Sequence, residues 1–275
     1  MSWPVRQPHH QRPHDPGRLD IECRQPKRFG RKKLGVFWFC RKWSPDSLSI
    51  TSSDVQMINL IMNKPRDADY NILCLGAHSD DIEIGCGGTI LEMLARHKNV
   101  AVSWCVFSSN TLREREARSS AELLLEGACQ RDIIIRDFRD GYFPFEGSQI
   151  KDEFEKIKQR CDPDLIFTHY RNDRHQDHRL ISDLTWNTFR NHLILEYEIP
   201  KYDGDIGSPN LFMPLNEATC LKKIRCIIDK FTSQSGKQWF DEQTFSAMLR
   251  LRGMEANSPT MFAEAFYCRK LVIDV

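Results

Sequence analysis

Short apolar runs alternate with amphipathic stretches along the chain from residue 71 onwards. The apolar runs at 71–76, 100–107, 132–138 and 165–168 are nearly continuous, which is typical of strands covered on both faces of a sheet. Between them, apolar residues recur at helical spacing in stretches that end near residues 96, 126 and 160. Strands that alternate with helices predict right-handed βαβ units and a mostly parallel sheet. We therefore expect a Rossmann-like, three-layer α/β/α fold in a single domain.

The pattern changes after residue 180. It predicts a helix to about residue 191, a short strand at 195–199 and a loop rich in Pro and Gly. Helices at 216–231 and 244–252 and a strand region at 262–273 complete the expected elements. The glycines at 85, 87 and 88 are interpreted as a turn ahead of the first helix. Their spacing is not that of the GxGxxG fingerprint, so phosphate binding at this turn is disfavoured.

The first 45 residues differ in composition from the rest of the chain. They hold eleven Lys and Arg against three Asp and Glu, whereas the whole 275-residue chain has a net charge of only +1. Residues 1–33 are rich in Pro, His and Arg and lack hydrophobic periodicity, which is typical of disorder. We expect a basic, disordered extension over residues 1–56 and the folded domain over residues 57–275. A mis-assigned translation start at Met57 or Met62 is an alternative, and nucleic acid is not the expected partner.

Hydropathy and cysteine spacing narrow the class of protein further. The mean hydropathy is −0.51, and the longest apolar run, residues 34–40, is too short to span a membrane. The ten cysteines form no CxxC pair, so a zinc site built from cysteines is not expected. Free thiols are typical of a reducing compartment, and we expect a cytoplasmic protein without a membrane span.

Polar loops follow two of the predicted strands. The segment AHSDD at 77–81 follows the strand at 71–76, and the segment HYRNDRHQDHR at 169–179 follows the strand at 165–168. Ligands of open parallel sheets bind beyond the carboxyl ends of the strands, so both loops are expected at one site. Imidazole and carboxylate groups bind zinc, and a catalytic zinc takes three ligands from the protein and leaves one position for water. The two loops therefore predict a metal site.

The spacing indicates how these side chains divide the chemistry. His78 and Asp81 are three residues apart, so one turn of backbone can present both to a single ion. Asp80 then points towards the open position, where a carboxylate can take a proton from water. His175 and His178 are also three apart. One of them would bind the metal and the other would face the substrate, and the aspartate between them would hold one imidazole in its tautomer.

Three segments together resemble the LmbE-like/PIG-L family of zinc-dependent N-deacetylases: AHSDD at 77–81, EIGCGG at 83–88 and HQDH at 175–178. The opening motif of that family is usually AHPDD, and Ser79 stands here in place of the proline, at a position that is not a ligand. The resemblance covers roughly residues 70–270, and the pairing of the motifs makes it specific.

The resemblance implies a site that holds one zinc ion per chain. Its protein ligands would be His78, Asp81 and His178. Asp80 would be the general base that activates the water at the metal.

The resemblance also implies roles for the residues that surround the metal. His175 would stabilise the tetrahedral oxyanion and protonate the leaving amine, and Asp177 would orient His175. Family members carry an Arg-x-x-Glu motif at the start of the second helix, where the arginine contacts the substrate. Arg113 is the better match to that arginine, and Arg115 is the alternative.

These features predict a zinc-dependent hydrolase that removes the acetyl group from an N-acetylated sugar of the N-acetylglucosamine type, carried on a larger glycoconjugate. A homo-oligomer is compatible with the sequence. One alternative is another metal-dependent amidase or hydrolase on the same fold. A magnesium-dependent phosphoryl-transfer enzyme is disfavoured because magnesium prefers oxygen ligands and this site offers imidazoles. A sugar-binding protein without activity is disfavoured because every catalytic position carries a competent residue.

Two further features of the sequence stay open. The aromatic residues Tyr142, Phe143 and Phe145 follow the third strand, where they would either stack on a sugar or form a hydrophobic plug. His169 follows the fourth strand and would either line the pocket or pack beneath it. Glu264 in the last strand is expected to be structural.

Overall fold

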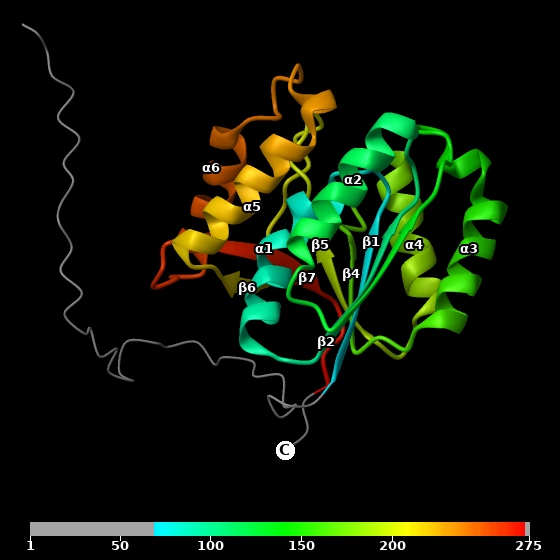
Figure 1. Ribbon diagram of the computed structural model, residues 1–275, viewed down its shortest axis with the longest axis horizontal. Coiled ribbons are helices and arrows are strands. Elements are labelled where there is room, and N and C mark those ends of the chain that lie inside the picture. The colour runs from blue at the N-terminus through cyan, green and yellow to red at the C-terminus, as the bar shows by residue number, and fades with distance from the viewer. Residues whose placement is uncertain (1–68, 273–275) are drawn as a thin grey trace, which may run out of the picture. The chain divides into compact units, whose positions relative to one another are not determined.

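A single sheet with helices on both faces forms the fold (Figure 1). The structure is a computed structural model that describes residues 69–272, so the predicted extension at 1–56 lies outside the described residues. Within the described range the three-layer α/β/α architecture is the one that the strand–helix alternation predicts, and the expected fold class is confirmed.

The sheet has seven strands in the order β3-β2-β1-β4-β5-β7-β6. The first five of these are mutually parallel, and β7 runs antiparallel to both β5 and β6. The strands are β1 (Tyr70–Gly76), β2 (Val100–Val106), β3 (Gln130–Ile135), β4 (Leu165–His169), β5 (Leu193–Tyr197), β6 (Leu211–Pro214) and β7 (Ala263–Cys268). β6 was not among the expected strands, because it is a four-residue edge strand inside a segment rich in Pro and Gly.

Six α-helices of the described residues cover the sheet. They are α1 (Asp81–Arg96), α2 (Thr111–Leu124), α3 (Gly147–Arg160), α4 (Gln176–Thr188), α5 (Glu217–Lys230) and α6 (Glu242–Glu255), with short 3₁₀ helices at Phe143–Phe145 and Thr232–Gln234. Figure 1 shows α3 and α4 on one face of the sheet and α1, α2, α5 and α6 on the other. No helix among residues 69–272 combines the length and the apolar character that a bilayer crossing requires.

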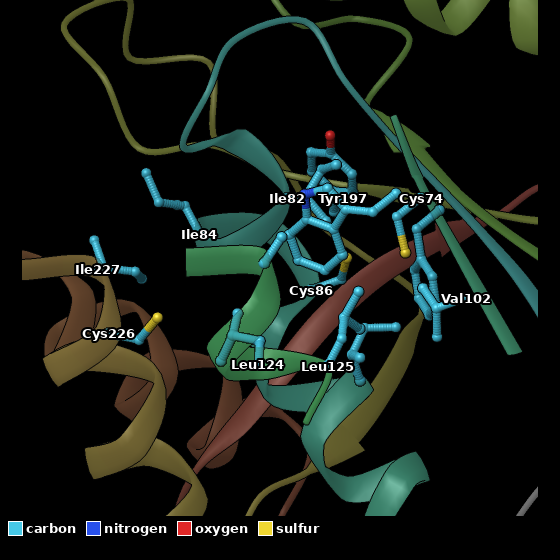
Figure 2. Packing of buried hydrophobic residues seen from close by; sticks show 14 of the residues in the cluster. Cys74, Ile82, Ile84, Cys86, Val102, Leu124, Leu125, Tyr197, Cys226 and Ile227 are labelled. Carbon is cyan, nitrogen blue, oxygen red and sulfur yellow. The ribbon is translucent and has the colours of Figure 1, made fainter. Parts of the chain in front are cut away.

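Alternation along β1 divides the core into two clusters. Ile72 and Cys74 point into the cluster under α1, α2, α5 and α6, whereas Leu73 and Leu75 point into the cluster under α3 and α4. Because successive strand residues face opposite sides, a nearly continuous apolar run is what a doubly covered strand requires. Figure 2 shows side chains of the first cluster, contributed by α1, by the sheet and by the helices that cover it.

The glycine segment after β1 is not a turn. Gly85, Gly87 and Gly88 lie inside α1, which begins at Asp81. A Cβ atom on Gly85 would lie 2.2 Å from the ring of Tyr197, and one on Gly88 would lie 2.5 Å from Leu215. These two glycines therefore let the helix backbone approach the sheet closely, and close packing overrides their low helix propensity.

The topology brings the two polar loops together. β1 and β4 are adjacent, parallel strands, with Ile72 opposite Leu165 and Cys74 opposite Phe167. They end at the same edge, so the loop after Gly76 and the loop after His169 start side by side. The chain order of the strands reverses at this point, because β1 has β2 on one side and β4 on the other. Such a switch point is where open α/β sheets place their ligands.

Candidate active site and metal centre

The loop after β1 is closed by its own side chains. The backbone N–H of His78 donates to Oδ2 of Asp81 over 2.6 Å, which fixes the turn into α1. Asp80 occupies the N-cap position of α1, and Asp81 is the first helical residue. All three side chains are nearly fully buried, at 8%, 4% and 3% exposure. A charged loop buried to this extent requires partners from elsewhere in the fold.

The structure brings together the three residues expected to bind the metal. Nδ1 of His78 lies 3.1 Å from Nε2 of His178 and 3.3 Å from Oδ2 of Asp81. The third side of this triangle, from His178 Nε2 to Asp81 Oδ2, is 3.6 Å. Tetrahedral zinc with bonds of about 2.0–2.1 Å requires its ligand atoms to lie about 3.3 Å apart. The triangle therefore has the dimensions of three corners of a zinc tetrahedron.

The outer ring nitrogens of both histidines contact carboxylates. Nδ1 of His178 lies 2.9 Å from Asp173, and Nε2 of His78 lies 3.1 Å from Asp140 and 3.4 Å from Asp177. A neutral imidazole that donates from its outer nitrogen carries a lone pair on the inner one. Two lone pairs and a carboxylate oxygen then face one another across the triangle. This donor set suits a divalent cation of the zinc type.

Burial and the charges of neighbouring side chains shift the pKa values of all three residues in the triangle. Burial lowers the pKa of His178 to about 3, assisted by the nearby His169, so the ring is neutral and able to coordinate. Burial by itself would raise the pKa of Asp81, but the surrounding imidazoles, His178 foremost, hold it well below its usual range. Burial also opposes protonation of His78, yet the carboxylates beside it, Asp81 first, raise its pKa well above the usual value. The carboxylates thus favour a positive charge on His78, and a divalent cation can take the place of that proton and free the lone pair of Nδ1.

Asp80, which is not part of the triangle, pairs with Arg113. Its Oδ1 accepts a hydrogen bond from Nη2 of Arg113 over 2.6 Å. Burial raises the pKa of Asp80, and the guanidinium of Arg113 opposes that rise. Arg113 is positioned at the start of α2, where the Asn110 side chain accepts from the N–H groups of Leu112 and Arg113.

Arg113 is also the arginine that reaches the site. Its Nε atom is buried and has no hydrogen-bond partner within the described part of the chain. Arg115, the alternative, is exposed. A buried N–H group without a partner, on a side chain that contacts Asp80, is a candidate donor to a substrate oxygen.

The geometry around Asp177 differs from the expectation. Its carboxylate was expected to orient His175, but it lies against His78 and accepts from the backbone N–H groups of Gly141 and Phe143 at 2.6 and 3.2 Å. The direct contact between the two residues runs the other way, since the N–H of Asp177 donates to Nδ1 of His175 over 3.3 Å. His175 is the N-cap of α4 and Asp177 follows two residues later, and side chains two apart on a helix do not face each other.

His175 nevertheless lies at the site. Its ring centroid is 4.8 Å from that of His78 and 4.6 Å from that of His178. Because its Nδ1 accepts a hydrogen bond, the neutral ring carries its proton on Nε2. Burial lowers the pKa of His175, and the neighbouring His78 adds to that effect.

His169 packs beneath the site. It is fully buried, its Nε2 accepts from the N–H of Ala77 over 2.9 Å, and its ring stacks on His178 with centroids 3.9 Å apart. Ligand atoms of Asp81, His169 and His178 also lie within 4.8 Å of one another. Since Nε2 of His169 already accepts a backbone N–H, His169 is better placed to support the His178 ring than to coordinate a metal ion.

Sequence reasoning assigned no role to Asp173. This carboxylate is buried and contacts three groups: Nδ1 of His178, the N–H of His175 and Nζ of Lys201. Burial opposes its ionisation, but the hydrogen bond with His178 and the nearby positive charges hold the pKa of Asp173 well below its usual range. Its position in the polar loop, two residues before His175, was the available signal. Its partner Lys201 is distant in sequence and gave none.

Comparison with known proteins relates part of the chain to a family. Residues 73–189 match the model of the PIG-L family, described as GlcNAc-PI de-N-acetylase. The chain is 28% identical over 142 residues to the uncharacterized deacetylase YaiS of Escherichia coli (strain K12), a match that covers 47% of this chain and 74% of YaiS.

Solved structures share the fold at lower identity. The conserved protein TT1542 from Thermus thermophilus has a TM-score of 0.57 at 20% identity, over 74% of this chain and 96% of its own. The N,N'-diacetylchitobiose deacetylase from Pyrococcus horikoshii has a TM-score of 0.54 at 21% identity, over 71% and 82%. GalB, the 4-carboxy-2-hydroxymuconate hydratase from Pseudomonas putida KT2440, has a TM-score of 0.60 at 15% identity, over 75% and 98%.

These likenesses agree with the motifs and with the fold on which they lie. The family match spans β1 to the end of α4, which is the part of the chain that carries both polar loops. Residues 73–189 are therefore similar to the PIG-L (LmbE-like) family of deacetylases, and the resemblance indicated by the sequence motifs is confirmed.

Proposed function

We propose that this protein is a zinc-dependent N-deacetylase that hydrolyses the acetamide of an N-acetylglucosamine-type sugar on a larger glycoconjugate. The observation that carries the proposal is the triangle of His78, Asp81 and His178, whose inner atoms lie 3.1–3.6 Å apart. The buried carboxylate of Asp80 precedes Asp81 in the same loop. The family description and the deacetylase relative support the reaction class. Two imidazole nitrogens in the triangle make magnesium, and hence phosphoryl transfer, a poor fit.

An amide is a weak electrophile with a poor leaving group. Its hydrolysis therefore requires polarisation of the carbonyl, deprotonation of the water and protonation of the nitrogen. In this proposal, His78, Asp81 and His178 hold the zinc ion. A metal ion bound there would supply Lewis acidity to the carbonyl oxygen and would lower the pKa of water. The remaining steps are carried out by side chains of the chain itself.

We assign the proton transfer from water to Asp80. Its Oδ1 is occupied by Arg113, so Oδ2 is the atom that accepts the proton as the water oxygen attacks the acetyl carbon. Burial makes Asp80 a stronger base than an exposed carboxylate, whereas the paired guanidinium of Arg113 keeps it ionised. Arg113 also has its buried Nε–H to offer to a substrate oxygen.

We assign stabilisation of the tetrahedral oxyanion to His175, and delivery of a proton to the leaving nitrogen to Asp80, which has taken that proton from water. The proton of the His175 ring lies on Nε2, because Nδ1 accepts the N–H of Asp177. The Nε2–H group can donate a hydrogen bond to the carbonyl oxygen as negative charge develops there. Asp80 then passes the proton from water to the departing nitrogen, so His175 stays neutral throughout. Breakage of the C–N bond releases acetate and the free amino sugar. Asp177 acts in this scheme by positioning His78 rather than His175.

Acetate release from a panel of N-acetyl amino sugars and their glycosides, with zinc-loaded protein, tests the proposal. We expect Asp80→Asn to lower kcat by at least about a hundredfold, the usual contribution of a general base, while zinc content stays at one per chain. Asp183→Asn, which changes an exposed carboxylate of α4, is the matched control and should retain full activity. Equal activity of Asp80→Asn and the parent protein would refute the assignment.

A further inference from the structure

The aromatic loop after β3 is divided by the structure into a buried part and an exposed part. Phe143 is fully buried in the cluster under α3 and α4, and its ring lies 6.2 Å from that of His78. Tyr142 is 41% exposed and Phe145 is 82% exposed. The hydrophobic plug considered from the sequence is therefore Phe143 alone, and the core does not account for the other two rings.

The loop is anchored directly to the candidate active site. Asp140 lies 3.1 Å from Nε2 of His78, and the next N–H group, that of Gly141, donates to Asp177 over 2.6 Å. Gln176 of α4 donates to the carbonyl oxygen of Gly141. Gly141 has a φ of +79°, which a residue with a side chain rarely adopts, so the sharp turn here depends on glycine. The contacts of Asp140 and Gly141, which precede Tyr142 by two residues and one, thus fix the backbone at Tyr142 relative to His78.

The exposed rings are ordered by contacts with each other. The guanidinium carbon of Arg139 lies 3.5 Å from the centroid of the Tyr142 ring, and the Tyr142 and Phe145 rings are 6.0 Å apart. The N–H of Phe145 donates to the carbonyl oxygen of Tyr142 within the short 3₁₀ helix. We call Arg139, Tyr142 and Phe145 the aromatic rim. A preordered, exposed aromatic surface loses little conformational entropy when it binds a ring.

We propose that the aromatic rim is a subsite for the ring, sugar or aryl, that is glycosidically linked to the reacting N-acetyl sugar. This inference rests on the proposed function and extends it to the substrate class: glycosides with a cyclic aglycone rather than free monosaccharides. Pyranose and aryl faces are flat and partly apolar, and aromatic side chains recognise them by face contact. Arg139 and Tyr142 of the rim flank Asp140, one residue before it and two after it. Asp140 contacts His78, so we place the rim beside the reacting sugar.

Steady-state kinetics on one-ring and two-ring substrates test the proposal. The probes are N-acetylglucosamine and its p-nitrophenyl glycoside, assayed with the parent protein, Phe145→Ala and Met254→Ala. The last variant truncates an apolar side chain of α6 that is 66% exposed and serves as the control. We expect Phe145→Ala to lower kcat/KM for the glycoside about tenfold by raising KM. For the monosaccharide, we expect kcat/KM of this variant to stay within about twofold of the parent protein. A loss of equal size on both substrates, or on neither, would overturn the subsite.

A binding measurement separates failure of this inference from failure of the proposed function. If none of the substrates releases acetate, the proposed function is wrong, and calorimetric titration with the p-nitrophenyl glycoside still tests the rim. Weaker binding by Phe145→Ala than by Met254→Ala would then support the subsite. Sedimentation of the same variants tests whether the rim instead binds a second copy of the chain. A change of association state in Phe145→Ala, with unchanged kinetics and binding, would make the rim a contact between copies and overturn the proposal.

Discussion

Nδ1 of His78 lies 3.1 Å from Nε2 of His178, although one hundred residues separate the two histidines in the chain. The pair meets because β1 and β4 are neighbours in the sheet and end at the same edge. Each ring is held on its outer nitrogen by different carboxylates, Asp173 on one side and Asp140 and Asp177 on the other. Two separate loops thus present preoriented imidazoles to one point, which is what a catalytic metal site needs.

Removal of one ligand should release the metal. We expect His178→Ala to lose bound zinc and all measurable deacetylase activity, since two remaining ligands are too few for a stable site. The measurement is zinc content by elemental analysis after gel filtration. His192→Ala, which changes a histidine far from the triangle, should keep one zinc per chain. Retention of zinc by His178→Ala would exclude the proposed ligand set.

Asp173 should act on metal affinity through His178. Asp173→Asn removes the charge that faces Nδ1 of His178, and such partners of metal-bound histidines typically contribute about 10–100-fold to metal affinity. We expect zinc binding, measured by competition with a chelating dye, to weaken by that factor while the fold is retained. The exposed Asp183→Asn again provides the control. Unchanged zinc affinity would show that Asp173 does not act through His178 and that its role is confined to binding Lys201 and the backbone of His175.

The site was predictable to the extent that its residues adjoin the strands. The two polar loops at neighbouring strand ends predict a metal site with His78, Asp81 and one of the histidines at 175 and 178. The family resemblance selects His178, whose Nε2 lies 3.1 Å from His78 and 3.6 Å from Asp81. Asp140 could not be found this way, because it reaches His78 only through the loop that Asp177 anchors. The orientation of Asp177 depends on where α4 begins, and a shift of the helix start by one residue changes which neighbour its carboxylate faces.

The fold was predictable where periodicity is strong. The strands β1, β2 and β4 are buried runs of five to seven residues, and each lies within a residue or so of its expected range. The glycines of α1 were predicted to form a turn, and this was wrong. Glycine is typical both of turns and of helices that pack closely, so the residue type does not distinguish the two. Only the position of Tyr197, more than a hundred residues later, distinguishes the two.

A buried ion pair should stabilise α1. Lys223 of α5 pairs with Glu264 of β7, and it also donates to the carbonyl oxygen of Ile84 over 2.7 Å. Glu264 in turn accepts from the N–H groups of Gly88 and Thr89, within α1. We expect Lys223→Met to lower the free energy of unfolding by about 3–5 kcal/mol, because it leaves a buried carboxylate without its countercharge.

Urea denaturation of Lys222→Met, a variant of the neighbouring residue, is the control for that effect. Lys222 is exposed, so Lys222→Met removes the same charge from α5 without removing a buried partner. We expect this variant to stay within about 0.5 kcal/mol of the parent protein. Equal destabilisation by the two variants would show that the ion pair contributes nothing beyond the net charge of the helix.

Two glycines of the same helix should respond to alanine with opposite sign. A Cβ atom on Gly85 would lie 2.2 Å from the buried ring of Tyr197, whereas a Cβ on Gly87 would meet Leu124 at 3.4 Å, an ordinary contact. Alanine gains about 1 kcal/mol over glycine in a helix interior. Overpacking against a buried ring costs about 1–3 kcal/mol, and displacement of Tyr197 adds the loss of its hydrogen bond to Leu75.

We therefore expect Gly87→Ala to raise the free energy of unfolding by up to about 1 kcal/mol and Gly85→Ala to lower it by about 1–3 kcal/mol. Both are measured by urea denaturation of the zinc-free protein, so that metal binding does not mask the difference. Because the two positions share one helix and one substitution, propensity cancels between them and the remainder is the contact with Tyr197. If both alanines stabilise the protein, α1 can move away from the sheet, and close packing is not the reason for Gly85.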